Sequence, residues 1–172
     1  MLRNRERRPR LPFRSVNCVG QPGYQPGMQR HHLLPRQLLA RACFGKLLAE
    51  IGADHVGFDD FRRNGLLLPA TGSSAVRLRL PLHRGPHGSY NEMVAQRIGC
   101  IEREWSRQRP RAPASSAAEA LMRLRLLQQA LRRRLLAVDR PPVRLNSAQP
   151  LGSGLDFTQL DSLADTLWAA TA

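Results

Sequence analysis

The sequence predicts a fold of the α+β class, in which short strands lie among longer amphipathic helices and a mainly helical extension follows. Three observations predict it. Apolar residues recur at helical spacing over several long segments, two short runs between them have strand character, and capping patterns precede two of the long segments. Hydrophobic residues make up 42% of the 172 residues and aromatic residues only 5%, so the core depends on aliphatic side chains.

The N-terminal segment has the composition of an irregular arm. Six arginines lie within residues 1–14, and residues 20–27 are rich in Gly and Pro. We therefore interpret residues 1–22 as a flexible Arg/Gly/Pro-rich arm that precedes a central domain at 23–108. Such an arm either follows a phosphate backbone or remains disordered, and the sequence leaves both alternatives open.

Residues 36–51 have the first helical pattern. Gly52 is a natural end for this helix, because glycine readily adopts the backbone conformation that follows a last helical turn. The apolar face of the predicted helix repeats every four residues, at Leu39, Cys43, Leu47 and Ile51.

Two short runs are the candidate strands. Residues 66–68 are three leucines, and Pro69 ends the run. Residues 76–80 alternate strictly between apolar residues and arginine, which is typical of a half-buried strand. The Asn64-Gly65 pair before the first run is by itself a hairpin signal.

Two further helices are indicated by capping boxes, in which a serine precedes a glutamate by three residues. The pairs are Ser89 with Glu92 and Ser116 with Glu119. We expect the two helices at about 90–106 and 116–138.

The segment after the first of these helices is predicted to form a separate part of the chain. Residues 109–113 contain two prolines and break the helical pattern. We therefore expect a helical C-terminal extension at 109–172, with a short amphipathic helix within 150–172. The sequence leaves open whether this extension forms a dimer interface, covers the basic groove or extends the core.

The chain is strongly basic, with a formal net charge of +14 from 27 Lys and Arg against 13 Asp and Glu. A globular protein of this charge usually binds a polyanion, and nucleic acid is the first candidate. Lys46 is the only lysine, so the arginine excess has a second explanation in a GC-rich genome. Charge alone does not separate DNA from RNA.

The cysteine spacing and the hydropathy argue against a disulfide-rich protein and against a membrane protein. Cys18, Cys43 and Cys100 contain no C-x-x-C pair, so they indicate neither a disulfide framework nor a four-cysteine zinc site. No apolar run approaches the roughly 18 residues of a transmembrane helix, and no apolar stretch follows the basic N-terminus as in a signal peptide. We therefore expect a cytoplasmic protein with reduced thiols and no membrane partner.

Four of the five histidines lie in two tight groups, His31-His32 and His83-x-x-x-His87. Histidine is the commonest neutral metal ligand and the side chain best suited to proton transfer near pH 7. Each group alone is weak evidence, whereas the two groups together, with Asn64 between them, favour a functional site. Adjacent residues of a strand point to opposite faces, so one histidine of the pair can bind metal while its neighbour addresses a substrate.

The second histidine group is not arranged along one helix face, because Pro86 disfavours helical backbone at Gly85. We expect His83 at the end of a strand or turn, and His87 directly before the helix at about 90–106. The free N–H groups of that helix start disfavour protonation of His87 and attract a phosphate oxygen. Two short strands, ligands at their end and a following helix make a ββα metal finger.

With these residues in place, the segment from about residue 23 to 105 resembles the AHH branch of the HNH/endonuclease VII nuclease superfamily. Arg30 is a departure, because the family usually has a small residue before the histidine pair. The resemblance implies a treble-clef-like HNH finger embedded in flanking helices. It rests on Gln29-Arg30-His31-His32-Leu33-Leu34-Pro35, Arg63-Asn64-Gly65-Leu66-Leu67-Leu68-Pro69 and Leu82-His83-Arg84-Gly85-Pro86-His87-Gly88-Ser89-Tyr90-Asn91.

The resemblance also implies an endonuclease with a one-metal mechanism. His32 would be the general base that takes a proton from the attacking water. Asn64 would hold the loop of His32 by hydrogen bonds to its backbone. The ligands of one divalent ion would be His31, His83 and His87.

Three further residues are candidate substrate contacts. Arg84 lies between two ligands and would contact phosphate, while Tyr90 and Asn91 would orient substrate or the histidines. A position in the core is the alternative for Tyr90. The ion is Mg²⁺, Mn²⁺, Zn²⁺ or Ni²⁺, and the sequence does not choose among these.

The predicted substrate is nucleic acid, with DNA favoured over RNA. The rival interpretation is a non-catalytic, basic nucleic-acid-binding protein with a structural metal site. A closed structural site normally has four protein ligands, however, and three histidines leave an open position. Nucleases that resemble this branch often serve as bacterial toxins with an immunity protein as partner, and a free-standing cytosolic or phage-derived nuclease is equally compatible. The oligomeric state is not indicated.

Overall fold

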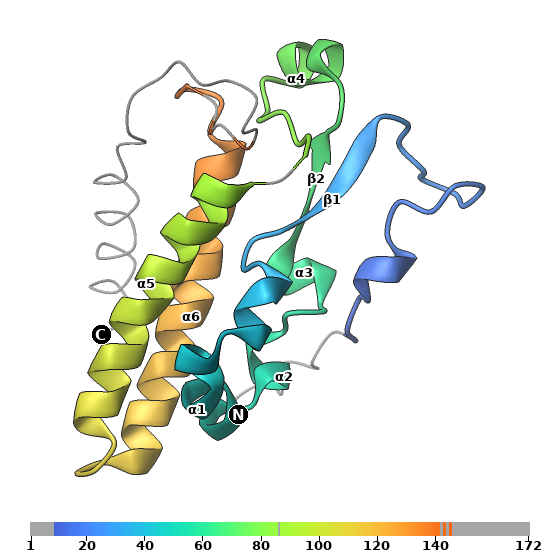
Figure 1. Ribbon diagram of the computed structural model, residues 1–172. Coiled ribbons are helices and arrows are strands. Elements are labelled where there is room, and N and C mark those ends of the chain that lie inside the picture. The colour runs from blue at the N-terminus through green and yellow to red at the C-terminus, as the bar shows by residue number, and fades with distance from the viewer. Residues whose placement is uncertain (1–8, 86, 142, 144, 146–172) are drawn as a thin grey trace, which may run out of the picture.

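The computed structural model describes residues 9–85 and 87–141 together with Val143 and Leu145. Within these residues, a two-stranded antiparallel sheet is combined with several helices (Figure 1), which confirms the predicted α+β class. In chain order the elements are a 3₁₀ turn (Phe13–Ser15), β1 (Met28–His32), a 3₁₀ turn (Arg36–Ala40), α1 (Ala42–Ile51), α2 (Ala53–Val56), α3 (Phe61–Asn64), β2 (Gly65–Pro69), α4 (Gly72–Leu78), α5 (Gly88–Gln108) and α6 (Pro113–Leu136).

The sheet brings the histidine pair next to the turn-like Asn64-Gly65 pair. Met28 of β1 lies opposite Pro69 of β2, and His32 lies opposite Gly65. The predicted strand at 66–68 is therefore confirmed as part of β2. Its partner is the strand that carries the two histidines, and not the segment at 76–80.

The predicted strand at 76–80 is wrong, because residues 72–78 form helix α4. Thr71 caps this helix by accepting a hydrogen bond from the Ser74 N–H at 3.3 Å. Strict alternation predicts a strand only where one face is buried, and here Val76 is 80% exposed. Without a buried face, the helix-capping signal decides the local structure.

The predicted helix at 36–51 is interrupted. The 3₁₀ turn at Arg36–Ala40 ends at Arg41, whose extended backbone (φ −78°, ψ 114°) separates it from α1. After this break only part of the predicted face is buried, namely Leu47 and Ile51 of α1. Leu39 is therefore 40% exposed, whereas Phe44, which the four-residue spacing does not include, is 3% exposed.

Helices α5 and α6 confirm the two long predicted helices, although both begin before the predicted capping serines. His87 is the N-cap of α5, so Ser89 already lies inside the helix. Pro113 begins α6, a position that suits proline because the N–H it lacks would be unpaired there. Ser116 consequently donates from inside the helix to the Pro113 carbonyl at 3.0 Å. The amphipathic helix expected within 150–172 lies outside the described residues.

The core lies where α1 packs against the antiparallel pair α5 and α6 (Figure 1). Leucine is its most frequent residue, and Tyr90, Ile98, Leu124 and Leu131 are among the side chains with at most 2% exposure. Cys18, Cys43 and Cys100 are free thiols. Among the described helices, none is long and apolar enough to cross a membrane.

Candidate functional site

The histidine pair at the end of β1 is divided between two surroundings, because neighbouring residues of a strand point to opposite faces. His31 is buried, with 2% exposure, and its ring contacts those of His83 and His87. His32 is half-buried and contacts the N-terminal segment instead. The pair thus supplies one side chain to a histidine cluster and one to a separate position beside it.

The cluster consists of His31, His83 and His87, and their candidate ligand nitrogens lie within 4.8 Å of one another. His83 lies in an irregular segment whose backbone is fixed to β2 by the hydrogen bond from the His83 N–H to the Pro69 carbonyl, at 2.8 Å. His87 caps the start of α5. Three imidazoles from a strand, a loop and a helix start therefore converge on one point.

Two of the three rings are oriented by hydrogen bonds at Nδ1. His83 Nδ1 lies 3.1 Å from Gln29 Oε1, and His87 Nδ1 lies 2.6 Å from the Leu145 carbonyl oxygen. These acceptors favour protonation of Nδ1 and leave Nε2 to bind an ion, which is the usual arrangement around metal-bound histidines. His31 Nε2 is buried and has no hydrogen-bond partner among the described residues. The donor set therefore fits one divalent metal ion.

The electrostatics of the cluster keep the His31 and His83 imidazoles neutral. Burial lowers the pKa of His31 far below its ordinary value, and the neighbouring His83 and His87 lower it further. Burial, followed by repulsion from His87, lowers the pKa of His83 to about 4. A metal ion binds only the neutral form of histidine. Both rings are thus in the ligand form near neutral pH.

His32 lies in the same cavity as the cluster, a hollow of about 270 Å³. Its ring stacks on Phe13, with the centroids 3.6 Å apart and the planes within 3°. Burial, followed by the charge of Arg36, lowers the pKa of His32 to about 4. Its Nε2 has no partner among the described residues. The cavity is lined by Arg30, His31, His32, Pro35, Arg36, Gln37, His83, His87 and Asn91.

Asn64 is fully buried and joins the end of α3 to the backbone just after the histidine pair. Its side-chain Oδ1 accepts from the Leu34 N–H at 2.8 Å, and Nδ2 donates to the Leu34 carbonyl at 3.0 Å and the Phe58 carbonyl at 3.1 Å. Its backbone carbonyl accepts from the Leu33 N–H at 2.8 Å. These bonds fix the loop that follows His32.

The three candidate substrate residues have different positions. Asn91 lines the histidine cavity, whereas Arg84 is exposed and does not line it. Tyr90 is 1% exposed, and its hydroxyl donates to the Leu33 carbonyl at 2.8 Å. Tyr90 therefore has the core position that the sequence offered as its alternative, and its ring supports His31 at 5.0 Å between centroids.

Several residues of the site carry no signal in the sequence. Phe13 and Leu145 contact histidines from segments far away in the chain, and Gln29, although it stands just before the histidine pair, contacts His83, 54 residues away. Gln128 of α6 is buried and donates to Asn64 Oδ1 at 3.2 Å. Such contacts follow no local spacing, so only the fold reveals them.

Arg30, the residue before the histidine pair, has a structural contact. Its Nη1 donates to the carbonyl of Phe13 at 2.8 Å. The residue that departs from the family pattern therefore holds the segment whose ring stacks on His32.

The comparisons with known proteins agree with this geometry. Residues 13–131, more than half of the chain, match AHH, a nuclease family of the HNH/ENDO VII superfamily with conserved AHH. Searches among curated proteins and among solved structures returned no match. The matched range contains the three clustered histidines, His32, Asn64 and most of α6. The chain belongs to the AHH nuclease family of the HNH/ENDO VII superfamily, and its activity is that of a phosphodiesterase acting on nucleic acid.

Proposed function

We propose that the protein is a metal-dependent endonuclease that hydrolyses phosphodiester bonds within nucleic acid, with DNA favoured over RNA. The observation that carries the proposal is a single cavity that contains both a three-histidine cluster and a fourth, separately positioned histidine. A structural site would need neither an open coordination position nor His32.

His31, His83 and His87 hold one divalent ion in this proposal. When bound, the ion supplies Lewis-acid stabilisation of the negative charge that develops on the phosphate and on the leaving oxygen. Gln29 and the Leu145 carbonyl keep the rings of His83 and His87 oriented for this task.

His32 is the general base. It accepts a proton from a water molecule whose oxygen attacks phosphorus, and the bond from phosphorus to the 3′-oxygen then breaks. The pKa of His32, lowered to about 4, keeps the ring neutral and able to accept that proton. Asn64 holds the following loop, and Phe13 fixes the plane of the ring.

The proposal is tested with protein from which metal has been removed by a chelator. Single divalent ions are then added back, and nicking of supercoiled plasmid is followed beside cleavage of an RNA of defined length. We expect at least one ion to restore cleavage, more for DNA than for RNA. His32→Ala should lower the rate by roughly 10²–10⁴-fold while metal binding, measured by calorimetry, is retained.

His55→Ala is the matched control, because His55 is exposed on α2 and does not line the cavity. This variant should cleave at nearly the parent rate. If no ion restores cleavage of either nucleic acid while the protein still binds them, the site is structural and the binding-protein alternative holds. A toxin role and an immunity partner stay predictions.

A further inference from the structure

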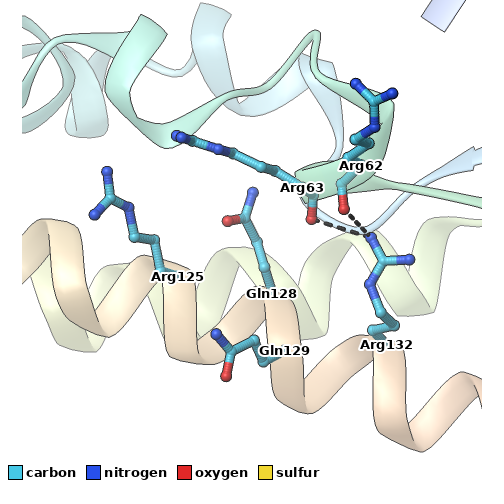
Figure 2. Close-up of a pocket in the computed structure, with 6 residues that line it drawn as sticks. All are labelled: Arg62, Arg63, Arg125, Gln128, Gln129 and Arg132. Atoms are coloured by element: carbon cyan, nitrogen blue, oxygen red, sulfur yellow. Dashed lines mark hydrogen bonds between the residues drawn. The ribbon is translucent and has the colours of Figure 1, made fainter. Parts of the chain in front are cut away.

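A second cavity, of about 330 Å³, lies between α3 and α6 (Figure 2). Its described lining contains no acidic residue and shares no residue with the histidine cavity. We propose that this arginine cavity binds phosphate groups of the substrate's nucleic-acid backbone, an inference that rests on the proposed nuclease function. Its lining residues are Arg62, Arg63, Arg125, Gln128, Gln129 and Arg132.

Helix α6 supplies one wall of the arginine cavity. Residues 125, 128, 129 and 132 follow one another at intervals of one, three or four positions, which places them on one side of a helix. Figure 2 shows Arg125, Gln128 and Arg132 pointing from α6 toward the segment of Arg62 and Arg63, while Gln129 lies along the side of the helix. Opposite α6, the Arg63 side chain extends along the cavity, whereas the Arg62 guanidinium points away from α6 and donates to the Pro9 carbonyl.

The guanidinium groups of α6 are held in place before any ligand binds. Arg132 Nη2 donates to the carbonyls of Arg62 at 2.9 Å and Arg63 at 3.3 Å, and Arg125 Nη2 donates to the His55 carbonyl at 3.4 Å. Burial lowers the pKa of Arg132, which means that its charge has lost part of its hydration. An anion in the cavity would compensate that loss.

The chemistry of the lining favours phosphate. A guanidinium has five N–H groups in a planar fork, and the carbonyl bonds of Arg132 come from Nη2 alone, so its Nε and Nη1 donors are available to a ligand. Phosphate oxygens match that fork with two parallel hydrogen bonds, and the exposed Gln129 amide can donate beside it. The Gln128 amide instead donates to the Val56 carbonyl and Asn64 Oδ1. Asp60 lies 3.6 Å from Arg63 and offsets part of the charge of that residue. Because the chain belongs to a nuclease family, phosphodiester groups are the relevant anions.

The arginine cavity lies close to the loop that follows His32. Gln128, which lines it, donates to Asn64 Oδ1. Arg63 lies two residues before Gly65, which is opposite His32 in the sheet, so the Arg63 and His32 backbones are at most roughly 13 Å apart. One full turn of duplex is about 34 Å long, so this separation is shorter than half a turn.

Binding is measured with matched variants, all in a His32→Ala background that prevents cleavage. Gln129→Glu adds a carboxylate to the cavity without removing an arginine, and Gln96→Glu makes the same change at an exposed position of α5. Arg125→Gln removes one charge from the cavity, and Arg133→Gln removes one from an exposed position of the same helix that does not line it. Each pair has the same net charge, so only position differs.

The probes are a fluorescent DNA duplex and an RNA of equal length, titrated by anisotropy at several salt concentrations. We expect each cavity variant to bind at least one probe roughly five- to tenfold more weakly at 0.1 M salt than its partner in the pair. The slope of log K against log salt should become shallower by about 1. The probe that shows the effect identifies the nucleic acid that uses the cavity.

Equal affinities and equal salt slopes within both pairs, for both probes, would overturn the proposal. The arginines would then serve only to join α6 to the backbone of α2 and α3. Thermal unfolding of every variant ensures that a weaker affinity does not result from misfolding. Plasmid cleavage by the parent protein tests the nuclease function separately, because the comparison within pairs does not depend on catalysis.

Discussion

Asn64 combines more structural tasks than any other single residue of the site. Its side chain bonds to both polar groups of the Leu34 backbone and to the Phe58 carbonyl, and it is inaccessible to water. A buried polar group that loses its partner costs about 1–3 kcal/mol. The residue therefore contributes to stability as well as to the position of His32.

Asn64→Ala should lower the free energy of unfolding by about 2–5 kcal/mol and abolish most cleavage, because several buried backbone groups lose their partner at once. Unfolding in urea, followed by circular dichroism, gives the stability. Asn91→Ala is the control, since Asn91 is half-buried and lines the cavity. A similar loss of unfolding free energy in both variants would contradict the role of Asn64 in holding the loop after His32.

Gln29 tests the orientation of the metal ligands. Gln29→Leu removes the acceptor of His83 Nδ1, and we expect the affinity for a divalent ion to fall by about 10–100-fold. Gln37→Leu makes the same change in another exposed glutamine, which lines the cavity without contacting a ligand ring. Calorimetric titration compares the two, and equal affinities would remove Gln29 from the metal site.

At the scale of elements, residues 11–13 of the N-terminal segment pack on the rest of the fold, which a flexible arm would not do. Pro12 forms an isolated bridge with Asp60, and the Leu11 carbonyl accepts from the Phe61 N–H at 2.7 Å. Phe13 is 6% exposed and contacts both His32 and Phe61. The domain boundary at residue 22 stays a prediction, although this segment already packs on the site.

Phe13→Leu should lower kcat about two- to tenfold with little change in KM, because an aromatic stack contributes about 0.5–1.5 kcal/mol beyond its buried area. Tyr24→Leu, a change of an exposed aromatic residue in the same segment, should leave both constants unchanged. Steady-state cleavage of a short duplex measures both. An unchanged kcat for Phe13→Leu would show that the stack has no role in proton transfer.

The sequence predicted those elements whose signals are local. The long helices α5 and α6 follow from periodicity over many residues, and Leu66 and Leu68 of β2 are buried as a leucine-rich strand predicts. The segment at 76–80 was mistaken because alternation alone does not report burial. Gln128 was missed because its contact with Asn64 spans 64 residues, and no spacing rule reaches that far.

At the scale of the whole molecule, the candidate metal site joins three parts of the fold. His31 comes from β1, His83 from the segment after α4, and His87 from the start of α5. These side chains converge only in the folded chain. An ion that binds them therefore favours the folded state over the unfolded one.

Saturation with the preferred ion should raise the melting temperature. At a free ion concentration of about 100 times Kd the stabilisation is about 2.7 kcal/mol, which corresponds to roughly 5–10 °C for a chain of this size. His31→Ala should abolish the rise, and His55→Ala should retain it. Differential scanning fluorimetry with and without chelator measures the shift, and an equal rise in both variants would place the ion elsewhere.

The contact between Arg30 and Phe13 gives the departure from the family's Ala-His-His pattern a physical meaning. Alanine at this position has no side chain that could reach the Phe13 carbonyl, so the N-terminal segment would lose that bond. Arg30→Ala would make the chain more typical of its family in sequence and less well ordered around His32. Arg30 thus connects the motif to a distant aromatic residue, and the two positions should be exchanged together when this site is transferred to another protein.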